Sequence, residues 1–150
     1  MEIRPITPAD LPHVLKLVQS LAQHHGDTPQ ASLDSLSRDL FGPAPWAQGL
    51  VGDEGGELQA YALLLPLMRA HLGQRGMDLH HLFVAEPARG AGLGTAMFRA
   101  VRAHVLAMGC DYLTVSTQEA NAEARDFYIH HGFTPAPPSP WRFAIDLSRG

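Results

Sequence analysis

The sequence has 150 residues, of which 45% are hydrophobic and 17% are charged; these proportions are typical of a single folded domain and exclude a disordered chain. Eleven basic residues against 15 acidic ones give a formal charge of -4, and the scattered basic residues do not favour nucleic-acid binding. The only cysteine, Cys110, favours a reducing cytoplasm, and the longest apolar run, residues 61–68, is too short to span a bilayer.

The first part of the chain predicts one strand and two helices. Residues 3–5 predict a short strand, and no apolar signal core stands near them. Residues 7–10 predict a helix start, because Thr-Pro-Ala-Asp combines an N-cap hydroxyl, an early proline and an acid in the first turn. An apolar stripe at helical spacing then runs to residue 24. A second, shorter helix is expected over residues 32–41, where a glycine and a proline stop it.

The hydrophobic pattern then changes from helical to strand-like. Residues 47–51 and 57–68 are apolar stretches joined by Gly-Asp-Glu-Gly-Gly, which predicts a hairpin. Pro66 is expected at a bulge or at a sheet edge. A polar connection through residues 75 and 76 leads to residues 78–85, whose Leu-Phe-Val centre predicts a largely buried strand.

The remaining elements alternate between helix and strand. Residues 92–108 predict a helix that opens directly from a glycine turn, and residues 111–117 predict a strand. Residues 121–131 predict a short helix, and residues 141–147 a last strand after a proline-rich stretch. The expected order is β-α-α-β-β-β-α-β-α-β(-β), an α/β protein with a single domain over residues 1–150.

The connection between the buried strand and the long helix predicts a phosphate-binding turn. Its sequence over residues 86–95 is Glu-Pro-Ala-Arg-Gly-Ala-Gly-Leu-Gly-Thr. The first amides of a helix have no partner within the helix and carry its positive dipole end, so they attract a phosphate. Glycines let the backbone approach an anion closely. Arg89 is expected to add a charged fork at the rim.

Spacing separates three kinds of phosphate site. A P-loop requires a lysine after its last glycine, but the only lysine of the chain is Lys16. A dinucleotide fingerprint requires a further glycine where Thr95 or Met97 stands, and an acid at the end of the next strand, whereas Asp111 lies at its beginning. The pattern that remains is Arg-x-x-Gly-x-Gly over residues 89–94.

This pattern resembles the coenzyme A pyrophosphate motif of the GNAT N-acetyltransferase superfamily. A stretch resembling the family's second signature follows at the expected distance, Asn121-x-x-Ala124-x-x-Phe127-Tyr128-x-x-x-Gly132-Phe133. The resemblance covers nearly the whole chain, because residues 3–10 look like the family's opening. Residues 39–42 and the pair Trp141-Arg142 are similar to its diamine (spermidine/spermine, thialysine) acetyltransferase branch.

The resemblance implies a mixed, mostly antiparallel central sheet flanked by helices. This GNAT-like sheet would be splayed between the strands expected at residues 78–85 and 111–117, with pantetheine in the gap. Acetyl-CoA would be the co-substrate. The positions implied for coenzyme binding are main-chain groups near Phe83 and Val84, the backbone of Arg89, Gly90, Ala91, Gly92, Leu93, Gly94 and Thr95, and the residues Asn121 and Tyr128.

Tyr128 is expected to be the general acid. In this family an amine attacks the thioester directly, so the site must accept an ammonium proton, stabilise the developing oxyanion and protonate the leaving thiolate. A phenol is a weak acid in water, but a thiolate held in contact with it is a sufficient proton acceptor. The alternative is that Tyr128 only packs against the coenzyme.

His80 is expected to be the base. The diamine branch carries adjacent acids on the strand before the glycine turn, and the matching positions here are His80 and His81. A histidine accepts a proton at neutral pH. Strand alternation is expected to send the two side chains to opposite faces, with His80 on the face of Asp78, Leu82 and Val84. The alternative is a structural histidine, with water as the proton carrier.

The expected substrate contacts are His24, His25 and His80. The first two stand where the diamine branch has acids near its first helix, so a less cationic acceptor than a polyamine is expected, such as a monoamine or an amino-acid-like amine. The histidine pairs at 24, 80 and 130 do not predict a metal site. Adjacent histidines diverge, and no His-Glu-x-x-His spacing or thiolate cluster accompanies them.

The expected function is acetyl transfer from acetyl-CoA to a primary amine of a small molecule. Two alternatives stay open: acetylation of a protein or peptide amine, and a catalytically silent module that binds acyl-CoA for regulation. The resemblance also implies a homodimer that exchanges C-terminal segments, with the proline-rich stretch before Trp141 as the hinge. Neither a nucleic-acid nor a membrane partner is expected.

Overall fold

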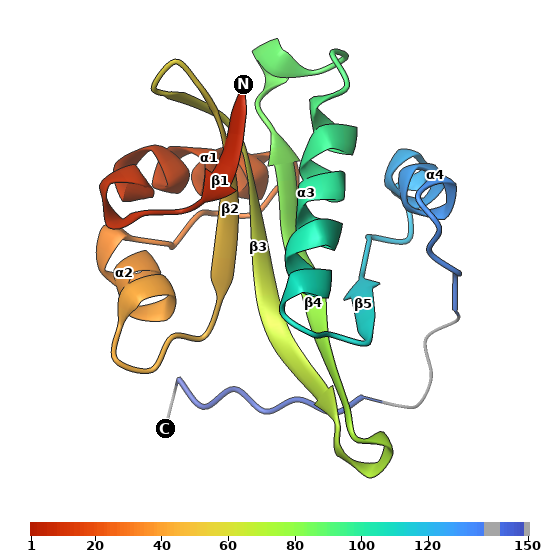
Figure 1. Ribbon diagram of the computed structural model, residues 1–150. Helices are drawn as coiled ribbons and strands as arrows, with labels where there is room; N and C mark the ends of the chain where they lie inside the picture. The colour runs from red at the N-terminus through yellow and green to blue at the C-terminus, as the bar shows by residue number, and fades with distance from the viewer. Residues whose placement is uncertain (137–141, 149–150) are drawn as a thin grey trace. The chain divides into compact units, whose positions relative to one another are not determined.

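The computed structural model describes residues 1–136 and 142–148. The chain divides into two compact units, residues 1–116 and 117–150, and each is described by itself. The first unit contains the sheet with helices α1, α2 and α3, and the second contains helix α4 (Figure 1). Within the described ranges, no helix is both long enough and apolar enough to cross a bilayer.

The first unit is built on one mixed sheet in the order β1-β2-β3-β4-β5. The three pairs from β1 to β4 are antiparallel, and β4 pairs with β5 in parallel. The strands are β1 (Glu2–Pro5), β2 (Gln48–Glu54), β3 (Glu57–Arg69), β4 (Gln74–Val84) and β5 (Tyr112–Val115). This is the mostly antiparallel α/β architecture that the sequence predicts.

The two hairpins follow from short turns. Gly55 and Gly56 join β2 to β3, as predicted, and the Gly56 amide donates to the Asp53 carboxylate at 2.8 Å. Pro66 lies beyond the last β2–β3 pair, Gln48 with Leu64, so within the described residues it has a strand partner only on the β4 side and stands at an edge, as predicted. Strand β4 begins at Gln74, earlier than predicted, because a single 3-10 turn over residues 70–72 is enough to reverse the chain.

The helices cover both faces of the sheet. The buried side of α1 (Leu11–His24) and α2 (Leu33–Phe41) packs in one cluster with Val51 and Tyr61 of the neighbouring strands β2 and β3. The next residue of β2, Gly52, faces the opposite side, where the Met97 sulfur of α3 (Leu93–Ala107) lies close to it. Figure 1 shows α3 lying along β4.

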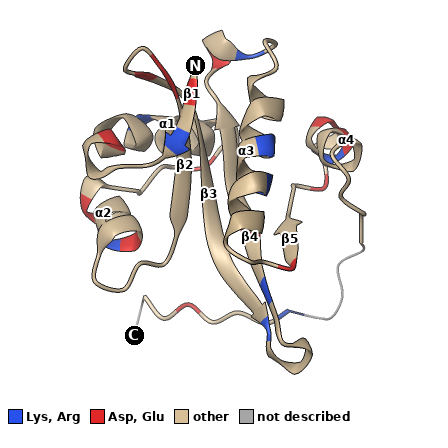
Figure 2. Ribbon diagram, viewed as in Figure 1, with Lys and Arg blue, Asp and Glu red and all other residues tan. Residues whose placement is uncertain are grey.

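An ion-pair network connects β1 to the start of the first helix. The Arg4 guanidinium donates to both carboxylate oxygens of Asp10, at 2.7 and 2.9 Å, and to Asp53 of β2 at 3.0 Å. The Thr7 amide donates to Asp10 at 2.7 Å. Apart from this network, the basic and acidic residues of the first unit are spread over several elements (Figure 2).

The second unit contains α4 (Ala122–His130), within the predicted range. Residues 142–147, where the last strand is predicted, are not in a strand, and Trp141 lies outside the described residues. A strand exists only with a partner for its backbone groups. The alternating pattern of residues 142–147 predicts the strand's faces but cannot supply that partner.

Candidate active site

The glycine turn lies between β4 and α3. A 3-10 turn over Glu86–Ala88 follows β4, and α3 begins at Leu93 with no side-chain cap. Gly90 and Gly92 have φ angles of 85° and 79°, a left-handed conformation that costs a residue with a Cβ free energy. The turn therefore delivers the chain to a helix N-terminus whose first amides point away from the helix, where an anion is favoured.

Arg89 is folded back toward the preceding strand. Its Nε donates to the Val84 carbonyl at 2.9 Å, and its guanidinium carbon lies 5.4 Å from the centre of the Phe83 ring. The Val84 carbonyl is therefore occupied. The two terminal nitrogens of Arg89 have no hydrogen bond to residues 1–136 or 142–148 and can still bind a phosphate.

The sheet opens between β4 and β5 just before this turn. The parallel pairing runs from Gly76 with Tyr112 to Leu79 with Val115 and ends there, while β4 continues to Val84. The edge of β4 over residues 80–84 therefore has no β5 partner. This opening lies where the resemblance to the GNAT superfamily implies a splayed sheet.

A β-bulge stands at the same point of β4. Leu63 pairs with His81 and the next residue, Leu64, pairs with Leu79, so His80 is an extra residue on its strand. The rings of His80 and His81 are stacked, with centres 4.4 Å apart and an angle of 11° between planes. The expectation that alternation sends them to opposite faces is wrong, because a bulge interrupts the alternation.

His81 is held by a buried tyrosine. The Tyr61 hydroxyl lies 3.0 Å from Nδ1 of His81, and the Tyr61 side chain is fully buried. Burial lowers the pKa of His81 to about 4, helped by the positive charges of His80 and His25. Sequence reasoning missed this pair. The available signal was a tyrosine inside an apolar run, because a buried phenol normally has a hydrogen-bond partner.

The histidines of the first helix are placed at its end. His24 is the last residue of α1 and His25 its C-cap, and both are exposed. Their ring centres are 5.8 Å apart. The charge of His25 acts on His81, so the structure brings His25 into electrostatic reach of the β4 bulge. No contact of His24 with the bulge is present within the described residues.

The second unit carries the other two predicted positions. The Asn121 side chain caps α4 by accepting from the Ala124 amide at 3.0 Å. Tyr128 is half-buried between aromatic neighbours, with ring centres 5.3 Å from Phe127 and 5.5 Å from Phe133. Burial raises the pKa of its phenol.

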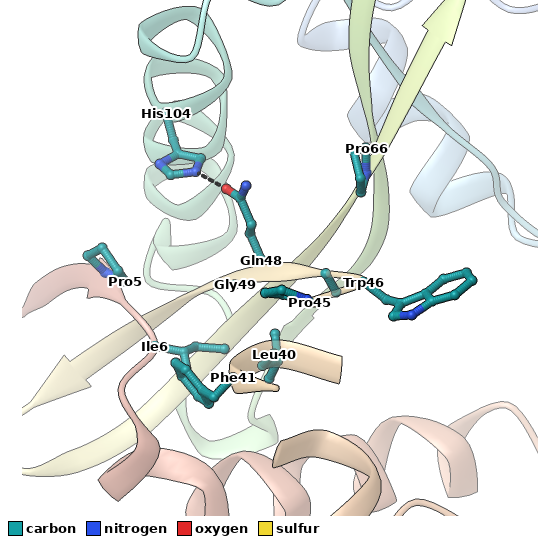
Figure 3. Close-up of a pocket in the computed structure, with 11 residues that line it drawn as sticks. Pro5, Ile6, Leu40, Phe41, Pro45, Trp46, Gln48, Gly49, Pro66 and His104 are labelled. Atoms are coloured by element: carbon teal, nitrogen blue, oxygen red, sulfur yellow. Dashed lines mark hydrogen bonds between the residues drawn. The ribbon is translucent and has the colours of Figure 1, made fainter. Parts of the chain in front are cut away.

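A separate pocket of about 350 Å³ lies in the first unit (Figure 3). Its one polar side-chain pair is His104 and Gln48, whose Nε2 and Oε1 atoms are 2.9 Å apart. None of the predicted site residues lines it. The lining residues are Pro5, Ile6, Leu40, Phe41, Pro45, Trp46, Ala47, Gln48, Gly49, Pro66 and His104. In the described part of the chain, no group of three or more potential metal ligands is assembled.

The turn, the opened sheet and the order of elements agree with a known family. The model of the Acetyltransferase (GNAT) family matches residues 18–133, which include the glycine turn and α4. The chain belongs to this family and is an N-acetyltransferase.

Individual relatives agree with this assignment. The chain is 26% identical over 136 residues to thialysine N-epsilon-acetyltransferase of Bos taurus, covering 84% of this chain and 79% of the relative. A solved structure described as a probable acetyltransferase has a TM-score of 0.84 at 20% identity, covering 97% and 99% of the two chains. Ribosomal-protein-alanine N-acetyltransferase from Brucella melitensis has a TM-score of 0.77 at 18% identity, covering 97% and 100%. At these identities the two solved structures share the fold.

Proposed function

We propose that this chain transfers an acetyl group from acetyl-CoA to a primary amine of a small molecule. The observation that supports the proposal most strongly is the glycine turn, which opens an uncapped helix next to the unpaired edge of β4. Acetyl-CoA is the co-substrate of the GNAT family to which the chain belongs. Its diphosphate fits the donors of a helix N-terminus.

Coenzyme binding is assigned to two stretches of backbone. The amides of the turn and of the first turn of α3, over residues 90–95, would bind the diphosphate, and the terminal nitrogens of Arg89 would neutralise part of its charge. The edge of β4 over residues 80–83 has no β5 partner and would pair with an extended pantetheine, whereas the Val84 carbonyl accepts from Arg89. Asn121 is proposed as a further coenzyme contact.

The chemistry needs one base and one acid from the protein. The amine nitrogen forms a bond to the acetyl carbon, and the carbon–sulfur bond of the thioester breaks. His80, or a water beside it, would accept the proton that the amine loses. Tyr128 would donate its phenol proton to the departing sulfur. Because burial raises its pKa, the phenol is fully protonated at neutral pH.

The acceptor is assigned to the class of small amines on two grounds. The curated relative in Bos taurus is named for thialysine, an amine of low molecular mass. Within the described residues, the charged groups that act on His81 at the bulge are His80 and His25, and no carboxylate is among them. We therefore propose an acceptor that is less cationic than a polyamine.

A panel of acceptors assayed for thiol release from acetyl-CoA tests this function. The panel contains monoamines, amino acids with a side-chain amine, polyamines and peptides with free N-termini or lysines. We expect the highest kcat/KM for a monoamine or an amino-acid-like amine. Spermidine as the best substrate would contradict the acceptor class, and peptides as the best substrates would establish the protein-directed alternative. A higher melting temperature with acetyl-CoA but no thiol release from any amine would indicate a silent binding module.

A further inference from the structure

Tyr61 and His81 form a pair that the proposed acetyl transfer does not use. Their rings meet edge to face with centres 5.9 Å apart, and the hydroxyl and Nδ1 are 3.0 Å apart. Tyr61 is 0% exposed in the middle of β3. Among residues 1–136 and 142–148, its hydroxyl has no hydrogen-bond partner other than His81.

The surroundings of the phenol decide which nitrogen of His81 carries the proton. A proton on Nδ1 would be donated to the tyrosine oxygen, and the buried phenol proton would then have no acceptor in the described part of the chain. A buried donor without an acceptor shifts the equilibrium between the two tautomers of His81 by about tenfold or more, toward the tautomer in which the phenol donates. Tyr61 therefore donates to Nδ1, and neutral His81 carries its proton on Nε2.

Nε2 of His81 is accessible from solvent. Nε2 has no hydrogen bond within the described ranges. Every side-chain nitrogen or oxygen that is buried there does have a hydrogen-bond partner. Nε2 is therefore not buried. Because the pKa of His81 is lowered to about 4, mainly by burial, the ring is neutral at pH 7. A neutral ring with Nδ1 engaged and Nε2 protonated acts as a hydrogen-bond donor and not as a base.

The neighbours of His81 favour one kind of ligand. The charged groups that act on it are His80, stacked against it on β4, and His25 at the end of α1, and both are positive when protonated. An ammonium group has donors and no acceptor, so it cannot pair with an Nε2–H donor. A carboxylate, carbonyl or hydroxyl accepts that hydrogen bond.

We propose that Tyr61 and His81 determine acceptor specificity: the buried phenol positions His81 as the Nε2–H tautomer, and Nε2 donates a hydrogen bond to an accepting group on the amine substrate. This proposal rests on the proposed transfer to an amine. It specifies the substrate class as amines that carry a hydrogen-bond acceptor, preferably a carboxylate, at a distance from the reacting nitrogen.

Four amines of equal chain length separate this class from polyamines. They are 5-aminopentanoate, 5-aminopentan-1-ol, pentylamine and 1,5-diaminopentane, which differ only in the distal group. With acetyl-CoA, we expect kcat/KM for 5-aminopentanoate to exceed that for 1,5-diaminopentane by about tenfold or more, because the donor is left unpaired with the diamine. A preference for the diamine would overturn the proposal.

Matched variants assign this preference to His81. His81→Leu removes the donor, so kcat/KM for 5-aminopentanoate and for 1,5-diaminopentane should come to within about threefold of each other. The value of kcat/KM for pentylamine should change little. His81→Gln restores an N–H donor and should restore the ratio. His71→Gln, an exposed histidine in the turn between β3 and β4, serves as the control and should keep the wild-type ratio. An unchanged ratio in His81→Leu would overturn the proposal.

Nitrogen-15 NMR of the histidine rings tests the tautomer without turnover. The signals of His81 are assigned by their loss in His81→Gln. In the wild-type protein they should show an unprotonated Nδ1 and a protonated Nε2. Tyr61→Phe keeps the ring and should yield a mixture of tautomers. The Nε2 signal should respond to 5-aminopentanoate and not to 1,5-diaminopentane. A protonated Nδ1 in the wild type would overturn the proposal.

These measurements separate the pair from the function. If acetyl-CoA binds and the Nε2 signal responds to 5-aminopentanoate but no amine is acetylated, the acetyl transfer fails and the specificity pair stands. If amines are acetylated without preference for an accepting distal group, the transfer stands and the pair fails.

Discussion

The phenols of Tyr61 and Tyr128 have different environments at the residue scale. Tyr61 is fully buried, and its hydroxyl lies 3.0 Å from Nδ1 of His81 inside the first unit. Tyr128 is half-buried between aromatic rings, and burial raises its pKa. A raised pKa keeps the phenol protonated at neutral pH, so its proton is available only to a thiolate held in contact with it. The general-acid role of Tyr128 remains a proposal.

Replacing Tyr128 by phenylalanine tests that role. Loss of a general acid should lower kcat by about 100-fold or more. The dissociation constant for acetyl-CoA should change by less than about threefold, because the ring is retained. Steady-state kinetics with an active amine and calorimetry with acetyl-CoA measure the two quantities.

Tyr112→Phe is the matched control for this variant. Tyr112 lies on β5 under the Arg69 guanidinium, 3.8 Å from its ring centre, and takes no part in the proposed site. It should keep the wild-type kcat. Equal loss of turnover in both variants, or unchanged turnover in Tyr128→Phe, would contradict the acid assignment.

The elements of the site were predictable to different degrees from the sequence. The glycine turn is local, so its spacing and its context between strand and helix were sufficient to predict it. The bulge at His80 depends on how β4 pairs with β3, which no pattern within β4 reveals. For this reason His80 was assigned to the wrong face, whereas His81 lies on the face of Phe83 as alternation predicts. Tyr61, the partner of His81, was missed. The strand predicted at residues 141–147 depends in the same way on a partner that the sequence does not identify.

The start of the first helical segment depends on one carboxylate. Asp10 is 9% exposed and accepts from Arg4 and from the Thr7 amide. The hydrogen bonds from Arg4 lower the pKa of Asp10 from 3.8 to about 2. A carboxyl with a lower pKa in the folded state stabilises the fold above its unfolded pKa, and this contribution is lost as the pH falls through the folded value.

Replacing Asp10 by asparagine should therefore destabilise the protein in a pH-dependent way. At pH 7 the free energy of unfolding should fall by about 1.5–3 kcal/mol, the range for hydrogen bonds to a charged group. The difference between wild type and Asp10→Asn should shrink as the pH falls from 3.8 through about 2. Urea unfolding at a series of pH values measures it. The exposed Glu57→Gln control should change the free energy by less than about 0.5 kcal/mol, and a difference independent of pH would contradict the account.

At the scale of the whole molecule, the C-terminal segment has an unusual surface. Phe143, Ile145 and Leu147 are 92%, 81% and 79% exposed. They alternate with smaller or polar residues, so an extended strand would present them on one face. Exposed apolar side chains gathered on one face are typical of an interaction surface. We propose that this segment takes part in a homodimer.

Light scattering after gel filtration tests the dimer. We expect a mass twice that of the 16.3 kDa chain. Replacing Phe143 and Ile145 by serine should lower the mass toward that of one chain, because it removes the apolar face. Asp146→Asn, on the opposite face of the alternation, should remain dimeric. A wild-type mass of one chain at all concentrations would contradict the proposal.

Calorimetric titration of the folded protein with acetyl-CoA and with S-acetylpantetheine tests the central claim that the turn over residues 89–95 binds a diphosphate. The two ligands share the thioester and differ in the diphosphate and nucleotide. The account predicts that acetyl-CoA binds at least about tenfold more tightly, since each hydrogen bond to a charged group contributes about 1.5–3 kcal/mol. Gly92→Ala should lose part of this difference, because φ at position 92 is 79° and alanine disfavours that conformation. No heat of binding with acetyl-CoA, or equal affinities for the two ligands, would contradict it.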